Sequence, residues 1–195
     1  MKKLAFALGV SVLLGACAGG MGMSGSTMSG TSGMAANPMV GGAPMYANKD
    51  IVDNAVNSRD HTTLVAAVKA AGLVDTLKSP GPFTVFAPTN AAFVALPAGT
   101  VDTLLKTENK GMLTTVLTYH VVPGRMDAAA LMAAINAGGG RAMLKTASGG
   151  TLTATASGGN VMITDAKGGT ATVTIANVYQ SNGVIHVVNK VLLPG

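Results

Sequence analysis

The chain is short of aromatic residues, of charge and of cysteine, and the first two shortages exclude a class of partner. Trp is absent, and three Tyr and four Phe supply all the aromatic surface, which is too little for a platform that stacks nucleic-acid bases. Charged residues make up only 11% of the chain. Without Lys2 and Lys3, which lie in a segment we expect to be removed, eleven basic and eight acidic residues leave a net charge of +3. Because the basic residues form no cluster, the sequence predicts no nucleic-acid partner.

Residues suited to catalysis or metal binding are also scarce. Glu108 is the only glutamate, and no pair of carboxylates stands out for acid–base chemistry. The three histidines, His61, His120 and His186, have no second His or Cys at a spacing that holds zinc. No G-x-S-x-G segment positions a nucleophilic serine. We therefore expect a protein that is not an enzyme and that uses no cofactor.

The N-terminus is typical of an export signal. Lys2 and Lys3 precede the apolar run 4–14, which is too short to span a bilayer comfortably and is followed by small residues. The sequence thus predicts that the N-terminal segment directs export and is then cleaved.

The four residues that end at Cys17, Leu-Gly-Ala-Cys, resemble the bacterial lipobox. This resemblance implies that residues 1–16 are a lipoprotein signal peptide and that Cys17 is acylated, so that the protein is anchored to a membrane without spanning it. It also gives a role to a lone cysteine that has no disulfide partner. The alternative is an ordinary signal peptide with an incidental cysteine. Ala18, by resemblance to enteric lipoproteins, indicates the outer membrane, facing the periplasm or the cell surface.

Residues 17–47 contain no charge and consist mostly of Gly, Ser, Thr, Ala and Met. Such a composition cannot offset the entropy of ordering, so we expect a flexible tether. Thioether sulfur is a ligand for Cu(I), which makes the methionines here weak metal candidates. The alternative is that Met only fills low-complexity sequence. The candidates are Met21, Met23, Met28 and Met34, and the same segment also holds Met39 and Met45.

From residue 48 onward the sequence contains charged residues and a periodic pattern of apolar residues. This change predicts a domain over residues 48–195. Apolar residues at i, i+3 and i+4 between 49 and 78 predict two short amphipathic helices, broken near Arg59 and with Gly72 ending the second. A buried strand over 83–87 is expected next. Pro88 stops this strand, and Thr89 is placed to cap a following helical turn.

The second half of the domain changes from helix to strand. We expect a helix over 113–119 that runs into a short strand at 120–122, and an Ala-rich helix over 127–136. Gly-Gly pairs then recur about every ten residues, at 149, 158 and 168, which predicts a β-meander. Helices first and strands later indicate an α+β domain.

Three segments resemble the fasciclin (FAS1) family: FTVFAPTNAAFVALP at 83–97, LTYHVVPG at 117–124 and NGVIHVVNKVLLP at 182–194. The resemblance implies a β-sandwich wedge with N-terminal and packed helices. It also implies a structural role for the residues of the signature segments. These are Phe83, Pro88, Thr89, Asn182, Gly183, His186 and Asn189.

Three residues in these segments invite a functional interpretation. His186 shares a strand face with Val184 and Val188, and a histidine among valines is usually hydrogen-bonded within the fold; the alternative is a ligand or catalytic role. Tyr119 and His120 match a motif linked to integrin binding in animal members, although the pair also suits packing. Family members commonly carry Asp at the position of Asn189, so any acidic recognition proposed for that segment is in doubt here.

Together these observations predict a cell-surface adhesion module. It would be a lipid-anchored FAS1 domain on a tether that recognises an extracellular matrix, glycan or cell-surface partner. The alternative is a periplasmic protein of soft-metal binding or stress defence that uses the Met-rich tether to hold Cu(I).

Overall fold

The computed structural model describes residues 37–97 and 99–195. The expected signal peptide, Cys17 and the candidate ligands Met21, Met23, Met28 and Met34 lie outside the described residues. Within the described part of the chain, no helix is both long and apolar enough to cross a membrane.

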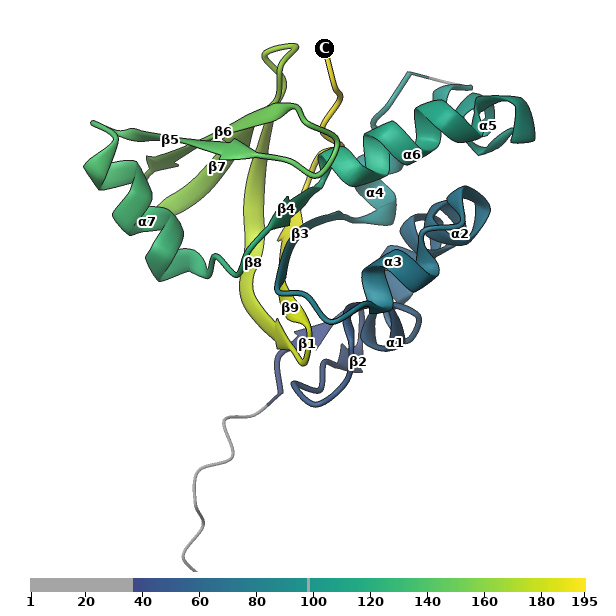
Figure 1. Ribbon diagram of the computed structural model, residues 1–195, viewed down its shortest axis with the longest axis horizontal. Helices are drawn as coiled ribbons and strands as arrows, with labels where there is room; N and C mark the ends of the chain where they lie inside the picture. The colour runs from purple at the N-terminus through teal and green to yellow at the C-terminus, as the bar shows by residue number, and fades with distance from the viewer. Residues whose placement is uncertain (1–36, 98) are drawn as a thin grey trace, which may run out of the picture. The chain divides into compact units, whose positions relative to one another are not determined.

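The helices are short, and most lie in the first half of the domain (Figure 1). They are α1 (Ile51–Ala55), α2 (Thr62–Ala71), α3 (Val74–Lys78), α4 (Asn90–Val94), α5 (Thr100–Leu105), α6 (Lys110–Tyr119) and α7 (Ala128–Ala137), with 3-10 turns η1 (Arg59–His61) and η2 (Thr107–Asn109). The expected break near Arg59 is the turn η1. Gly72 ends α2 in the left-handed conformation, at φ 72°, which glycine adopts without steric cost.

The strands form a small hairpin and one seven-stranded sheet. They are β1 (Met39–Val40), β2 (Ala43–Pro44), β3 (Phe83–Pro88), β4 (Val121–Pro123), β5 (Arg141–Lys145), β6 (Thr151–Ser157), β7 (Asn160–Thr164), β8 (Thr170–Gln180) and β9 (Gly183–Val188). The sheet order is β4-β3-β9-β8-β7-β6-β5. Only the central β3–β9 pair is parallel, and the last strands form the expected meander. The α+β fold is confirmed.

Strand β8 joins the two halves of the sheet. Its first residues pair with β7, and most of its length pairs with β9 through a ladder that is interrupted twice between Val173 and Val178. Such irregularities bend and twist a strand. Within them Asn177 has a φ of 60°, and its Oδ1 accepts a hydrogen bond from the N–H of Ala128, 2.7 Å away, at the start of α7. The bend folds the sheet into a wedge (Figure 1).

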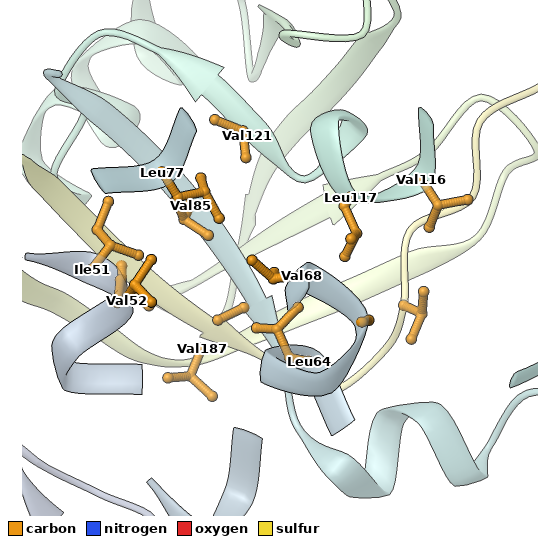
Figure 2. Close-up of a cluster of buried hydrophobic side chains, with 14 of the residues drawn as sticks. Ile51, Val52, Leu64, Val68, Leu77, Val85, Val116, Leu117, Val121 and Val187 are labelled. Carbon is orange, nitrogen blue, oxygen red and sulfur yellow. The ribbon is translucent and has the colours of Figure 1, made fainter. Parts of the chain in front are cut away.

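Two hydrophobic cores lie on opposite sides of β3 and β9. The helix-side core packs α1, α2, α3 and α6 against these strands, and Figure 2 shows their side chains converging. The sheet-side core fills the wedge between the meander, α7 and the other face of β3 and β9, with Leu152 and Ile163 fully buried. Alternation along β9 supplies both cores, since Ile185 and Val187 face the helices and Val188 faces the meander.

The expected domain start at Asn48 is wrong by about ten residues. The hairpin β1–β2 lies within the segment expected to be tether, and it places Val40 and Met45 in the helix-side core with 3% and 2% of their surface exposed. Asn54 holds the end of this hairpin, because its side-chain amide both accepts from the N–H of Tyr46 and donates to its carbonyl. The burial of two apolar side chains and these hydrogen bonds offset the conformational entropy that the segment loses on ordering, which its composition alone did not predict.

Candidate functional site

His186 lies in the middle of β9 and is completely buried. Its Nε2 donates to the carbonyl of Met126 at 2.8 Å, and its ring stacks on Phe86 with 5.8 Å between centroids. Burial lowers the pKa of the imidazole, which is therefore neutral at pH 7. The histidine thus ties β9 to the segment that precedes α7.

Tyr119 is also an internal residue, with 1% of its surface exposed. Its hydroxyl donates to the carbonyl of Thr151 at 2.8 Å and accepts from the N–H of Ala166 at 3.0 Å. Burial raises the pKa of the phenol. The tyrosine therefore joins the end of α6 to two turns of the meander.

His120 links α6 to the C-terminal segment. Its Nδ1–H donates to the carbonyl of Val116 at 2.8 Å, and its Nε2 accepts from the N–H of Leu192 at 2.9 Å. Both ring nitrogens are satisfied only in the neutral form, and burial lowers the pKa to about 4. Since Tyr119 and His120 are both buried and bonded, they present no surface to a partner, and the packing role is the one that this structure supports.

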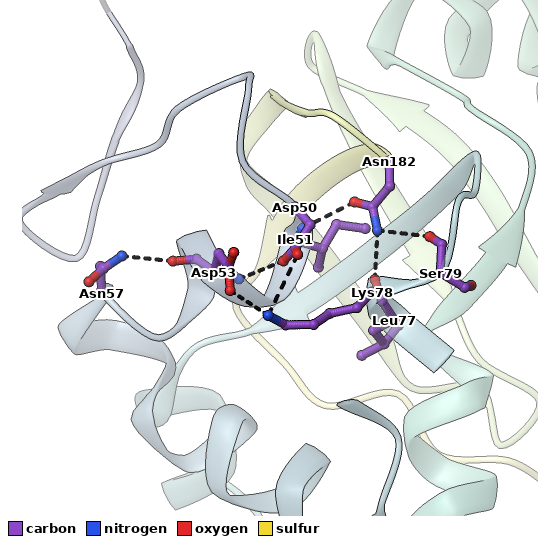
Figure 3. A network of polar contacts seen from close by, with 8 residues as sticks. All are labelled: Asp50, Ile51, Asp53, Asn57, Leu77, Lys78, Ser79 and Asn182. Carbon is purple, nitrogen blue, oxygen red and sulfur yellow. Dashed lines mark hydrogen bonds and ion pairs between the residues drawn. The ribbon is translucent and has the colours of Figure 1, made fainter. Parts of the chain in front are cut away.

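Asn182 binds three elements together at the turn between β8 and β9 (Figure 3). Its Oδ1 accepts from the N–H of Ile51 at 3.1 Å, and its Nδ2 donates to the carbonyls of Leu77 and Ser79 at 2.7 and 3.1 Å. The adjacent Gly183 has no room for a side chain, because a Cβ there would overlap the carbonyl oxygen of Phe83. These positions fix where α1 and α3 dock on the sheet.

The same corner carries an ion pair at the surface. Lys78 Nζ lies 2.7 Å from Asp53 Oδ1 and 3.7 Å from Asp50 Oδ2, and Asp50 also caps α1 by accepting from the N–H of Asp53 (Figure 3). Because these side chains are largely exposed, the pair adds little stability, and the cap is the larger contribution.

The remaining signature residues are structural as well. Phe83 pairs with Gly183 and Pro88 with Val188 in the parallel β3–β9 ladder. Thr89 caps α4 by accepting from the N–H of Ala92 at 3.3 Å. Asn189 accepts from the N–H of Thr172 at 2.8 Å through its Oδ1, a bond that an Asp carboxylate makes equally well.

Asp165 is a structural anchor that the sequence pattern did not single out. Its buried carboxylate accepts from the N–H groups of Lys167, Gly169 and Leu193 at 3.0, 2.7 and 3.0 Å. It thus closes the turn between β7 and β8 and holds the C-terminal segment. A short Asp-x-x-x-Gly turn in a meander is the only sequence signal for it.

The structure places an apolar cavity of about 90 Å³ in the helix-side core. The cavity lies between α1, α2 and α3 on one side and the sheet on the other, and its lining is almost wholly apolar. Among the few polar side chains that line it is His61, whose Nδ1 is hydrogen-bonded to Ser58 Oγ at 2.9 Å and whose Nε2 has no partner. Burial lowers the pKa of His61, so this ring is also neutral at pH 7. The sequence did not reveal this cavity.

For metals, the described residues contain no group of three or more His, Cys, Asp or Glu side chains placed to hold an ion. Met45, one of the methionines in the expected tether, is buried in the core and is not available as a ligand, whereas Met39 is 57% exposed. The copper hypothesis therefore depends on methionines outside the described residues.

Comparison with known proteins agrees with the signature segments. The model of the Fasciclin domain family matches residues 59–194. Protein sll1483 of Synechocystis is 46% identical over 74% of this chain and 73% of its own length. Cell surface glycolipoprotein MPB83 of Mycobacterium bovis is 45% identical over a shorter stretch, 40% of this chain and 37% of its own.

Among solved structures, a FAS1 domain pair from the insect cell adhesion molecule Fasciclin I matches with a TM-score of 0.65 at 17% identity. The match covers 74% of this chain and 51% of that one, so the chain spans about half of the insect pair. The matched family model covers more than half of the sequence, and the signature segments lie in helices and strands of the described fold. The chain therefore belongs to the fasciclin domain family.

Proposed function

We propose that the chain is a lipid-anchored adhesion module of the bacterial cell envelope. In this proposal Cys17 carries the acyl anchor, the segment up to about residue 36 is the tether, and the FAS1 domain binds an extracellular protein or glycan. The observation that carries the proposal is the order of these parts, a Leu-Gly-Ala-Cys segment followed by an uncharged low-complexity stretch and then a FAS1 domain. The names of two similar proteins, a cell surface glycolipoprotein and a cell adhesion molecule, support it.

The internal chemistry of the domain also favours binding over catalysis. His61, His120 and His186 are buried and neutral at pH 7, and Tyr119 is hydrogen-bonded on both sides of its hydroxyl. Groups committed to the fold in this way do not act on an external substrate. This favours a role for the exposed surface of the domain in adhesion.

The anchor is tested by replacing Cys17 with Ser, because a hydroxyl cannot form the thioether through which the lipid is attached. We expect the variant to lose membrane partitioning in cell fractionation and to lack the mass of the acyl groups. A matched Ser24→Ala change in the tether should partition like the unchanged protein. Unchanged partitioning and mass for Cys17→Ser contradict the lipoprotein assignment.

The adhesion role is tested by screening the mature protein on arrays of matrix proteins and glycans. Whole-cell surface labelling then shows whether the domain faces the exterior or the periplasm. A ligand that is retained on the array and that also holds intact cells through this protein supports the proposal. Labelling confined to permeabilised cells contradicts adhesion to an external partner.

A further inference from the structure

The cavity in the helix-side core is a feature that adhesion does not explain. Protein interiors are normally close-packed, with few voids larger than a water molecule, and an apolar void costs stability because its walls lose contacts. Here the void of about 90 Å³ lies among Val52, Leu64, Val68, Leu77 and Val85. An engineered apolar cavity of about 150 Å³ stays dry and binds benzene. The walls of this cavity are thus suited to hydrocarbon rather than to water.

The cavity is lined by residues from several elements, and some of these residues are exposed. Its lining extends from Val40 and Met45 of the hairpin, beneath α2 and α3, to Thr118 and Ala147 beyond β4. Ala147 and Lys69 are exposed, whereas the residues along the floor are buried. A cavity with a buried apolar floor and exposed residues at its rim suits the hydrocarbon tail of an amphiphile whose polar end stays in water.

The hairpin β1–β2 supplies a wall that can yield. Each of its strands has two residues, and Met45, which points its side chain into the core, has a flexible unbranched side chain that adapts to irregular gaps. A tail longer than the present volume admits would require the Met45 side chain to change its rotamer.

Charge at the rim points to the head group. Lys69 is the one ionised side chain among the lining residues, and they include no Asp or Glu. In the described part of the chain Lys69 makes no salt bridge, in contrast to Lys78. A carboxylate at the rim would lie within reach of the long Lys69 side chain while the tail occupies the cavity.

We propose that this cavity binds a free fatty acid, with its tail among the helix-side core residues and its carboxylate at Lys69. This proposal does not rest on the adhesion role, so the two proposals stand or fall separately. The site would let an envelope protein hold or pass on a single acyl chain.

The first test is a fluorescence titration of the full-length mature protein with cis-parinaric acid, followed by displacement with decanoic acid or decanol. We expect saturation at one equivalent, with the acid displacing the probe at about tenfold lower concentration than the alcohol. Lys69→Gln should abolish this preference, and Lys106→Gln, an exposed lysine that does not line the cavity, should keep it. Absence of saturable binding overturns the proposal, and so does a preference that survives Lys69→Gln.

The second test places a larger side chain in the wall of the cavity. Ala55 lines the cavity and is half-buried, so Ala55→Leu should weaken cis-parinaric acid binding by about tenfold or more because the added side chain occupies the tail's place. Ala66→Leu, at an exposed position of α2 outside the lining, is the matched control. Equal binding by the two variants overturns the location.

A third measurement needs no variant and remains valid if Ala55→Leu does not fold. Methyl NMR of the unchanged protein with a doxyl-labelled stearic acid should broaden the resonances of Val68, Leu77 and Val85, and spare those of Leu152 and Ile163 in the sheet-side core. Broadening of the sheet-side methyls, or of none, overturns the proposal.

Discussion

The two cores of this domain are built from similar side chains but from different elements, and the structure places a cavity of about 90 Å³ in the helix-side core. The sheet-side core is assembled from hydrogen-bonded neighbouring strands, whose ladders fix the spacing of adjacent side chains. The helix-side core is assembled from helices of five to ten residues and a hairpin, which meet as separate cylinders and leave a cavity. The two cores thus differ in how much of their wall is set by backbone ladders and how much by the packing of separate helices.

The largest expected effect is a comparison of one Leu→Ala change in each core. Leu152→Ala should cost about 4 kcal/mol of unfolding free energy, because ladders on both sides of β6 prevent the vacancy from closing, whereas Leu64→Ala should cost about 2–3 kcal/mol because α2 can shift. Urea denaturation of both variants provides the measurement. A larger loss for Leu64→Ala would show that the helix-side core is the rigid one.

Variants of His186 test how much this residue of β9, a strand between the two cores, contributes to stability. His186→Ala removes the bond to Met126 and the stacking on Phe86, for an expected loss of about 2–4 kcal/mol. His186→Gln should lose less, since an amide can still donate to the Met126 carbonyl. If His186→Ala unfolds like the unchanged protein but fails to bind an identified partner, the structural role is wrong.

Protonation of His120 should make the fold less stable in acid. Its pKa is about 4 in the fold and 6.5 when unfolded, so the unfolded chain binds the proton first and the fold loses stability as pH falls. The contribution is complete above pH 6.5, declines between pH 6.5 and about 4, and amounts to about 3 kcal/mol. Denaturation at pH 7, 6 and 5 should show a flatter profile for His120→Asn than for the unchanged protein. Parallel profiles would contradict the assignment to His120.

The hairpin tests how far the helix-side core extends along the chain. Met45→Ala should cost about 2 kcal/mol because Met45 is buried, whereas Met39→Ala, at an exposed position in the same hairpin, should stay within about 0.5 kcal/mol. Thermal unfolding of the two variants gives the comparison. Equal melting temperatures would contradict a contribution of Met45 to the core and would favour a domain that starts at Asn48.

The smallest effect is expected at Asn189, which ties the end of β9 to β8. Asn189→Asp keeps an acceptor for the N–H of Thr172 and should change stability by less than about 0.5 kcal/mol, while Asn189→Ala should lose about 1 kcal/mol. Chemical denaturation at neutral pH is the measurement. A loss for the Asp variant as large as for Ala would show that the amide N–H₂ group matters.

Most of the fold could be predicted because its signals are local. The break at Arg59, the helix end at Gly72, the cap at Thr89 and the Gly-rich meander all follow from backbone preferences within a few residues. Helix α5 and the hairpin β1–β2 were not predicted, because each is short and weakly patterned and is held by contacts with distant parts of the chain.

The sequence by itself determined the family and the α+β order of elements, because the signature motifs and the alternation of apolar residues along a strand lie in consecutive residues. Only the tertiary structure decided that Tyr119 and His120 are sealed within the fold, that Asp165 anchors the C-terminal segment, and that Val40 and Met45 belong to the domain. The cavity, too, is a feature that only the tertiary structure shows. Burial and voids depend on how elements far apart in the chain meet, and the free energy of those contacts has no local signal in the sequence.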